Sequence, residues 1–213
     1  MSRLSAFDAA FVALPLVAIL RGLHPDEAEE MGEVLVEAGF TLVEVPLNSP
    51  DPLTSVTRLA KRLGDRAVVG AGTVLTVAAV AQVEAAGGAM IISPNADVRV
   101  IAAAADRELV SLPGVSTPTE AFAALDAGAT ALKLFPAEGS SPAILKAMRA
   151  VLPPDLRVLP VGGVAPDNIA PWIAAGAAGF GLGSALYKPG MDAEEVGRNA
   201  RAFVQAWRAA ETS

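Results

Sequence analysis

Short apolar runs alternate with segments of helical periodicity along almost the whole chain. After a leading helix expected to end near Ala13, eight runs have the length and composition typical of buried β-strands. These runs are residues 16–20, 41–45, 67–69, 89–92, 109–112, 129–134, 158–161 and 178–182. The segments between them space apolar residues three or four apart, which predicts amphipathic helices. The predicted helices are residues 28–38, 53–63, 77–86, 98–105, 120–125, 143–151, 168–174 and 193–210.

A strand followed by a helix, repeated eight times, is the pattern of a (β/α)8 TIM barrel. We therefore expect an α/β protein with a short leading N-terminal helix and a single domain over residues 1–213. Helix boundaries support the alternation, because Thr117 and Glu120 form a capping-box sequence with Pro118 at the first helical position. A doubly wound open sheet uses the same alternation and remains an alternative.

The composition narrows the classes of function. Hydrophobic residues make up 53% of the chain and charged residues 18%, which favours a large interior and an oligomer interface. A net charge of -7 argues against a nucleic-acid partner, because phosphate backbones require clustered Lys and Arg. Without cysteine there is no disulfide or thiolate chemistry, and the single histidine, His24, cannot build a histidine-rich zinc site.

Two uncharged stretches could imitate membrane or export signals. Residues 9–20 are too short to span a bilayer and contain Pro15, and residues 169–187 contain Pro171 and four glycines. We therefore expect no membrane partner, and the cytoplasm is the default location.

Lys133 is the one lysine of four that lies in an apolar run predicted as a strand. Burial of an ammonium group is unfavourable unless the group is paired or loses its proton, and an unprotonated amine is a nucleophile. Two structural alternatives stay open: the side chain reaches a strand end, or it closes an ion pair.

Other polar residues follow the predicted strands at their carboxyl ends, where barrel enzymes place their chemistry. They are Arg21, Glu44, Asn48, Thr73, Gly162, Gly163, Gly183 and Ser184. Burial would raise the pKa of Glu44 and a cation such as Lys133 or Arg21 would lower it, which produces a group able to accept and to donate a proton. A buried salt bridge between Glu44 and Arg21 is the structural alternative.

Two glycine-rich corners, Gly162-Gly163 and Gly183-Ser184, follow the last two predicted strands. Loops in this position commonly bind phosphate, because glycine lets backbone N–H groups approach the oxygens. A strand lysine, a strand glutamate and a phosphate cradle at one rim together indicate Schiff-base chemistry on a phosphorylated keto compound.

The motifs that carry these residues resemble the class I 2-keto-3-deoxy-6-phosphogluconate and phosphogalactonate aldolases, the KDPG/KHG/KDPGal aldolase family. The resemblance runs in order over nearly the whole chain. Its motifs are residues 18–22 (AILRG), 44–50 (EVPLNSP), 70–75 (GAGTVL), 133–136 (KLFP), 161–164 (VGGV) and 181–184 (GLGS).

This resemblance implies that Lys133 forms a Schiff base with the C2 carbonyl and that Glu44 shuttles protons. Thr73 and Arg21 would hold the pyruvyl carboxylate and adjacent oxygens. Gly162, Gly163, Gly183 and Ser184 would bind the phosphate. The products would be pyruvate and glyceraldehyde 3-phosphate, and the family assembles as homotrimers. The imine itself serves as the electron sink, so we expect no metal or organic cofactor.

Substrate choice follows from finer differences. Gluconate-type members usually carry Arg at the position of Asn48 and Thr at the position of Val161, whereas this chain has the galactonate-type Pro46, Asn48 and Val161. The expected substrate is 2-dehydro-3-deoxy-6-phosphogalactonate, with 2-dehydro-3-deoxy-6-phosphogluconate or 4-hydroxy-2-oxoglutarate as the alternative. Two rival classes are a phosphate-binding barrel that isomerises its substrate by acid-base chemistry and a non-catalytic ligand-binding barrel.

Overall fold

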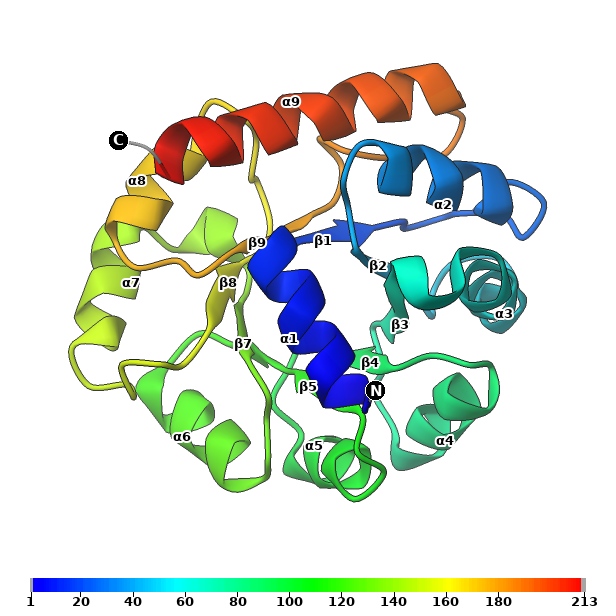
Figure 1. The fold of residues 1–213 in the computed structure, drawn as a ribbon. Coiled ribbons are helices and arrows are strands. Elements are labelled where there is room, and N and C mark those ends of the chain that lie inside the picture. The colour runs from blue at the N-terminus through cyan, green and yellow to red at the C-terminus, as the bar shows by residue number, and fades with distance from the viewer. Residues whose placement is uncertain (1, 212–213) are drawn as a thin grey trace.

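The computed structural model describes residues 2–211, which form α-helices and short parallel β-strands in alternation (Figure 1). The helices are α1 (Arg3–Ala13), α2 (Ala28–Glu37), α3 (Pro52–Leu63), α4 (Val77–Ala85), α5 (Val98–Ala105), α6 (Pro118–Asp126), α7 (Pro142–Arg149), α8 (Ile169–Ala174) and α9 (Ala193–Glu211). The strands are β1 (Leu16–Ile19), β2 (Leu42–Pro46), β3 (Val68–Gly72), β4 (Met90–Ile92), β5 (Val110–Leu112), β6 (Gly114–Val115), β7 (Leu132–Leu134), β8 (Val158–Pro160) and β9 (Phe180–Leu182).

These strands do not form the closed eight-stranded barrel that the sequence predicted, so that prediction was wrong. They divide into a six-stranded sheet in the order β5-β4-β3-β2-β1-β9 and a three-stranded sheet in the order β6-β7-β8. Between the β8 and β9 regions, one isolated bridge joins Val161 to Gly181 among the described residues. Pro113 lies between β5 and β6, where its carbonyl accepts from the Lys133 N–H at 2.9 Å, and Pro160, which has no N–H to donate, ends β8.

Local signals placed most elements correctly. Every predicted strand run overlaps an observed strand, and every predicted helix overlaps an observed helix. Thr117 caps α6, and its side chain and that of Glu120 form the reciprocal bonds of the predicted capping box. Strand β6 was missed, because a strand of two residues leaves no apolar run to detect.

The core consists of two layers. One cluster fills the space between the strands and the surrounding helices, and a second fills the interior that the strands enclose. Within residues 2–211, α1 supplies the helical side chains of this interior cluster, and the other members come from the strands or the residues next to them. The other helices lie around the outside of the strands (Figure 1), unlike the two-faced arrangement of a doubly wound sheet.

Helix α1 lies across the amino ends of the strands and closes the interior there (Figure 1). Its Phe7 and Phe11 are buried with ring centroids 5.6 Å apart. The guanidinium of Arg157 stacks over Phe11, 4.6 Å from the ring centroid. Access to the interior is therefore left to the carboxyl ends of the strands, where the predicted site residues lie.

Between residues 2 and 211, no helix is long and apolar enough to cross a membrane. Within the same range, no group of three or more His, Asp and Glu side chains is arranged to hold a metal ion.

Candidate active site

Lys133 lies in the middle of β7, between Leu132 and Leu134, and its side chain is only 7% exposed. Its ammonium nitrogen is 4.4 Å from the centroid of the Phe135 ring, a favourable but weak cation–π contact. Burial lowers the pKa of Lys133, and the positive charge of Arg21 lowers it further, while Glu44 acts in the opposite direction. The structure thus favours the unprotonated, nucleophilic amine more than water does.

Glu44 lies on β2 and is 2% exposed. Burial raises its pKa to about 7, against the opposing effects of Lys133, Arg21 and a backbone hydrogen bond from Gly72. Its Oε2 atom has no hydrogen-bond partner among the described residues. A carboxyl group with a pKa near neutrality can both accept and donate a proton during a reaction.

Gly72, at the end of β3, makes the position of Glu44 possible. The parallel pairing of β2 with β3 sets Glu44 opposite Gly70 and Pro46 opposite Gly72, and the Glu44 carboxyl group lies over Gly72. A Cβ atom at residue 72 would lie 2.1 Å from Oε2 and 2.4 Å from Oε1 of Glu44. Only glycine leaves room for the carboxyl group here.

Glu44 and Lys133 line the same small void inside the strands. The remaining lining is almost wholly apolar: Val17, Ile19, Ile92, Leu112, Leu159, Val161 and Gly181. No ion pair within 4.0 Å joins Glu44 to Lys133 or to Arg21 in the described part of the chain. The two salt-bridge alternatives therefore do not describe this site, which holds an amine and a carboxyl group facing one dry space.

A larger cavity of about 360 Å³ adjoins this void and shares Ile19, Lys133 and Val161 with it. It lies at the carboxyl ends of the strands and contains most of the predicted site residues. The predicted residues in its lining are Arg21, Lys133, Val161, Gly162, Gly163, Gly183 and Ser184.

Three predicted residues are not part of this lining: Glu44 lines only the small void, and Asn48 and Thr73 line neither space. Asn48 is exposed, and its Oδ1 accepts a 2.7 Å hydrogen bond from Arg21, which does line the cavity. Thr73 follows β3 directly and has a φ angle of 57°, an unusual conformation for a β-branched residue. Backbone strain of this kind is concentrated at functional sites.

The Gly162-Gly163 corner is held in a defined shape. Both glycines have positive φ angles, 112° and 64°, which other residues rarely adopt. Asn168 holds the loop through two hydrogen bonds: its Nδ2 donates to the Gly163 carbonyl at 2.8 Å, and its Oδ1 accepts from the Ala165 N–H at 3.0 Å. Such a preformed corner suits an oxyanion.

Sequence reasoning missed several residues that line the cavity, above all Glu138 and Lys188. A Cβ atom at Gly162 would lie 2.0 Å from a carboxylate oxygen of Glu138, so this carboxylate covers the glycine corner. The available signals were positional: Glu138 follows the Lys133 strand within five residues, and Lys188 follows Ser184 within four. The other missed lining residues are Ile19, Val164, Tyr187 and Pro189.

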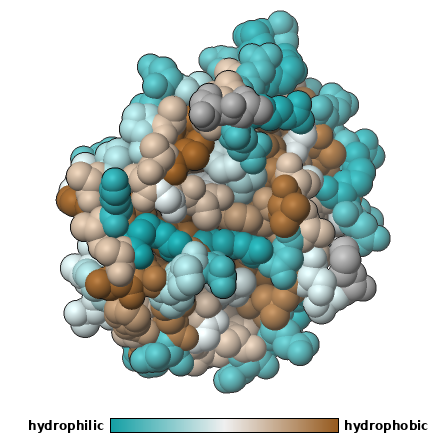
Figure 2. Space-filling model, turned by 60° about the vertical axis from the view of Figure 1, so that its left-hand side comes forward, coloured by the Kyte–Doolittle hydropathy of each residue, from teal (hydrophilic) through white to brown (hydrophobic). Residues whose placement is uncertain are grey.

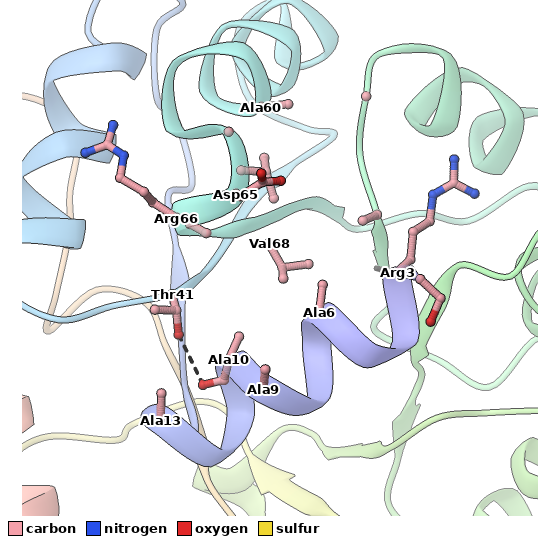
Figure 3. A pocket seen from close by; sticks show the side chains of 16 residues that line it. Arg3, Ala6, Ala9, Ala10, Ala13, Thr41, Ala60, Asp65, Arg66 and Val68 are labelled. Carbon is pink, nitrogen blue, oxygen red and sulfur yellow. Dashed lines mark hydrogen bonds between the residues drawn. The ribbon is translucent and has the colours of Figure 1, made fainter.

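A second cavity, of about 540 Å³, lies at the opposite ends of the strands, between α1 and the start of β3 (Figure 3). Small side chains of α1, such as Ala6 and Ala10, form much of its wall. Its two arginines, Arg3 and Arg66, point away from each other in Figure 3 and form ion pairs with Glu84 and Glu33. Neither Lys133 nor Glu44 lines this cavity.

Comparisons with known proteins agree with the geometry. The family model of KDPG and KHG aldolases matches residues 7–201. The 2-dehydro-3-deoxy-6-phosphogalactonate aldolase of Escherichia coli (strain K12) is 48% identical over 197 residues, which cover 92% of this chain and 96% of that protein.

Solved structures give the same result. A native KDPGal structure is 47% identical and superposes with a TM-score of 0.93 over 94% of this chain and 97% of its own. A KDPG aldolase from Legionella pneumophila, with pyruvate captured at low pH as a covalent carbinolamine intermediate, is 26% identical, with a TM-score of 0.80 over 99% of this chain and 98% of its own.

Proposed function

Because the chain belongs to the KDPG and KHG aldolase family, a family of carbon–carbon lyases, we propose that it cleaves 2-dehydro-3-deoxy-6-phosphogalactonate through an imine on Lys133. The reaction is reversible and yields pyruvate and glyceraldehyde 3-phosphate. One observation carries the proposal: a buried lysine with a lowered pKa shares a dry void with a buried glutamate whose pKa is about 7.

The chemistry follows from these two groups. The amine of Lys133 attacks the C2 carbonyl of the substrate, and Glu44 donates the proton that lets the carbinolamine lose water to form the imine. Glu44 then accepts the proton of the C4 hydroxyl while the C3–C4 bond breaks. The electron pair of that bond moves into the imine, which becomes an enamine, and the aldehyde departs. Protonation of C3 and addition of water release pyruvate and restore the amine.

The remaining residues hold the two ends of the substrate. Arg21, positioned by Asn48, and Thr73 bind the pyruvyl carboxylate and adjacent oxygens at the β1–β3 side of the site. Gly162, Gly163, Gly183 and Ser184 bind the phosphate at the glycine corners. The carboxylate and the phosphate thereby anchor the substrate on either side of Lys133 and hold C2 against the amine.

A borohydride experiment tests this proposal. The protein is incubated with pyruvate and reduced, and peptide mass spectrometry locates the added mass. We expect an adduct on Lys133 in the native protein and none in Lys133→Met. An adduct confined to Lys61, Lys146 or Lys188, or no adduct at saturating pyruvate, would contradict the proposal and favour an acid-base isomerase.

We propose further that residues 1–213 act as one domain and assemble as a homotrimer. The interior cluster joins Leu42 of the larger sheet to Leu159 of the smaller one, which supports a single domain. On the side of α7 and α8, hydrophobic patches alternate with hydrophilic ones (Figure 2).

Several large apolar side chains in or next to α4, α5, α6 and α7 are 42–50% exposed, which supports an interface on this part of the surface. They are Leu75, Val77, Val98, Phe122 and Ile144. Light scattering should give three times the chain mass, and a monomer at micromolar concentration would contradict the assembly.

A further inference from the structure

We propose that Lys188 binds the phosphate group of the substrate and thereby makes the enzyme selective for phosphorylated aldehydes. This inference rests on the proposed function, since it concerns the same cavity. Lys188 lies in the segment after β9 and lines the 360 Å³ cavity together with Gly162, Gly163 and Ser184. It therefore belongs to the same cavity wall as the glycine corners that are proposed to bind the phosphate.

The backbone around Lys188 is held firmly. Before it, the N–H groups of Leu186 and Tyr187 both donate to the Gly183 carbonyl, at 2.8 and 3.0 Å, and Tyr187 is buried. After it, Pro189 packs closely against Gly22: a Cβ atom at residue 22 would lie 2.6 Å from Cγ of Pro189. The N–H of Lys188 itself donates to the sulfur of Met191 at 3.3 Å. Lys188 is thus presented from a rigid turn, which limits the entropy lost when it binds.

The charges that line the cavity leave one cation for the phosphate. Of the three cations in the lining, Lys133 must lose its charge to react, and Arg21 is held by Asn48. The ammonium of Lys188 is exposed and has no hydrogen bond or ion pair with any residue in the range 2–211.

Glu138 strengthens the need for this cation. Its carboxylate covers the corner at Gly162, so the phosphate meets a negative charge where it approaches the backbone N–H groups. Backbone N–H groups carry only partial charges, whereas a phosphate monoester carries nearly two negative charges at neutral pH. A lysine is an effective point charge for such a group, and a bond between ionised partners is stronger than one between neutral groups.

The test compares Lys188→Met with Lys146→Met in the addition of pyruvate to aldehydes. Lys146 is an exposed lysine of α7 outside the cavity lining, so both variants lose one surface cation. For Lys188→Met we expect KM for glyceraldehyde 3-phosphate to rise about tenfold, with kcat changed less than about twofold. KM for unphosphorylated glyceraldehyde should stay unchanged, Lys188→Arg should restore most of the affinity, and Lys146→Met should behave as the native protein.

Inhibition by glycerol 3-phosphate gives a second measurement that needs no turnover of a poor substrate. Its inhibition constant should rise about tenfold in Lys188→Met and not in Lys146→Met. An equal rise in KM for both aldehydes in Lys188→Met, or an unchanged inhibition constant for glycerol 3-phosphate, would overturn the role of Lys188.

Trapping with pyruvate and borohydride separates this failure from a failure of the proposed function. A Lys133 adduct in Lys188→Met with unchanged KM values refutes the phosphate role alone. Absence of the adduct from the native protein refutes the proposed function and this inference with it.

Discussion

A carboxylate oxygen of Glu44 on β2 lies so close to Gly72 on β3 that a Cβ atom there would stand 2.1 Å away. The missing side chain on one strand therefore leaves the space that the Glu44 carboxyl group on the next strand occupies. This relationship couples the pairing of two strands to the chemistry of the site.

Gly72→Ala should displace the Glu44 carboxyl group and lower kcat by about 100-fold or more, the range that general acid-base catalysis supplies. Overpacking should also destabilise the fold by about 1–3 kcal/mol. Gly139→Ala is the matched control, because a Cβ there meets nothing closer than Pro136 Cγ at 3.8 Å. Steady-state kinetics and urea denaturation give both quantities, and native kcat in Gly72→Ala would contradict the argument.

Glu44→Gln should change how stability depends on pH. The pKa of Glu44 rises from 4.5 in the unfolded chain to about 7 in the folded one, so between these values the unfolded chain loses its proton first. The contribution of Glu44 to stability is therefore complete below pH 4.5 and is lost as the pH rises through 7. The free energy of unfolding of the native protein, relative to Glu44→Gln, should fall by up to about 3 kcal/mol across this window.

Urea denaturation at pH 4.5 and pH 7.5 measures this difference. Glu29→Gln, on the exposed face of α2, is the control for the loss of one carboxylate. A constant difference between native protein and Glu44→Gln at the two pH values would show that the carboxyl group is not held in a dry environment.

Lys133→Met should abolish activity without destabilising the fold at pH 5.5. Burial disfavours the ammonium, and Met fills a similar volume without a charge. At this pH Glu44 is mostly protonated, so removal of its partner leaves no unpaired charge. We expect a free energy of unfolding equal to or about 1 kcal/mol above that of the native protein. A clear loss of stability at pH 5.5 would indicate that Lys133 has a structural role.

Val161→Thr should shift preference between the two substrate epimers that differ at C4. Val161 is 8% exposed and lines both the catalytic void and the larger cavity. A hydroxyl at this position can bond to a substrate oxygen that Val161 leaves without a partner, which is worth about tenfold in kcat/KM. The ratio of kcat/KM for the galactonate and gluconate epimers is the readout, and an unchanged ratio would remove Val161 as a selectivity residue.

The sequence predicted the individual helices and strands better than it predicted how the strands assemble into sheets. Apolar runs and caps such as Thr117 with Glu120 are local signals, and they located the helices and most strands. Closure depends on hydrogen bonds between strands distant in sequence. The strands divide into two sheets, joined between the β8 and β9 regions by the isolated bridge of Val161 to Gly181, and periodicity does not reveal this division.

The same distinction applies to the site. Lys133 and Glu44 could be found because a charge inside an apolar run is an anomaly that sequence alone displays. Glu138 and Lys188 are exposed charged residues outside the strands, which is ordinary, and only the folded chain brings them to one cavity. The role of Gly72 was also hidden, since it depends on the register between β2 and β3.

The aromatic closure formed by Phe7 and Phe11 shuts the interior at the amino ends of the strands, so both products of the proposed reaction must leave by the carboxyl ends. In the proposed mechanism the three carbons of pyruvate stay bonded to Lys133 until the imine is hydrolysed, and the phosphorylated fragment would lie beside Ser184 and Lys188 in the larger cavity. The aldehyde must depart first, and pyruvate can follow only after water enters by the same route. In the synthetic direction the order reverses, so pyruvate is the obligatory first substrate.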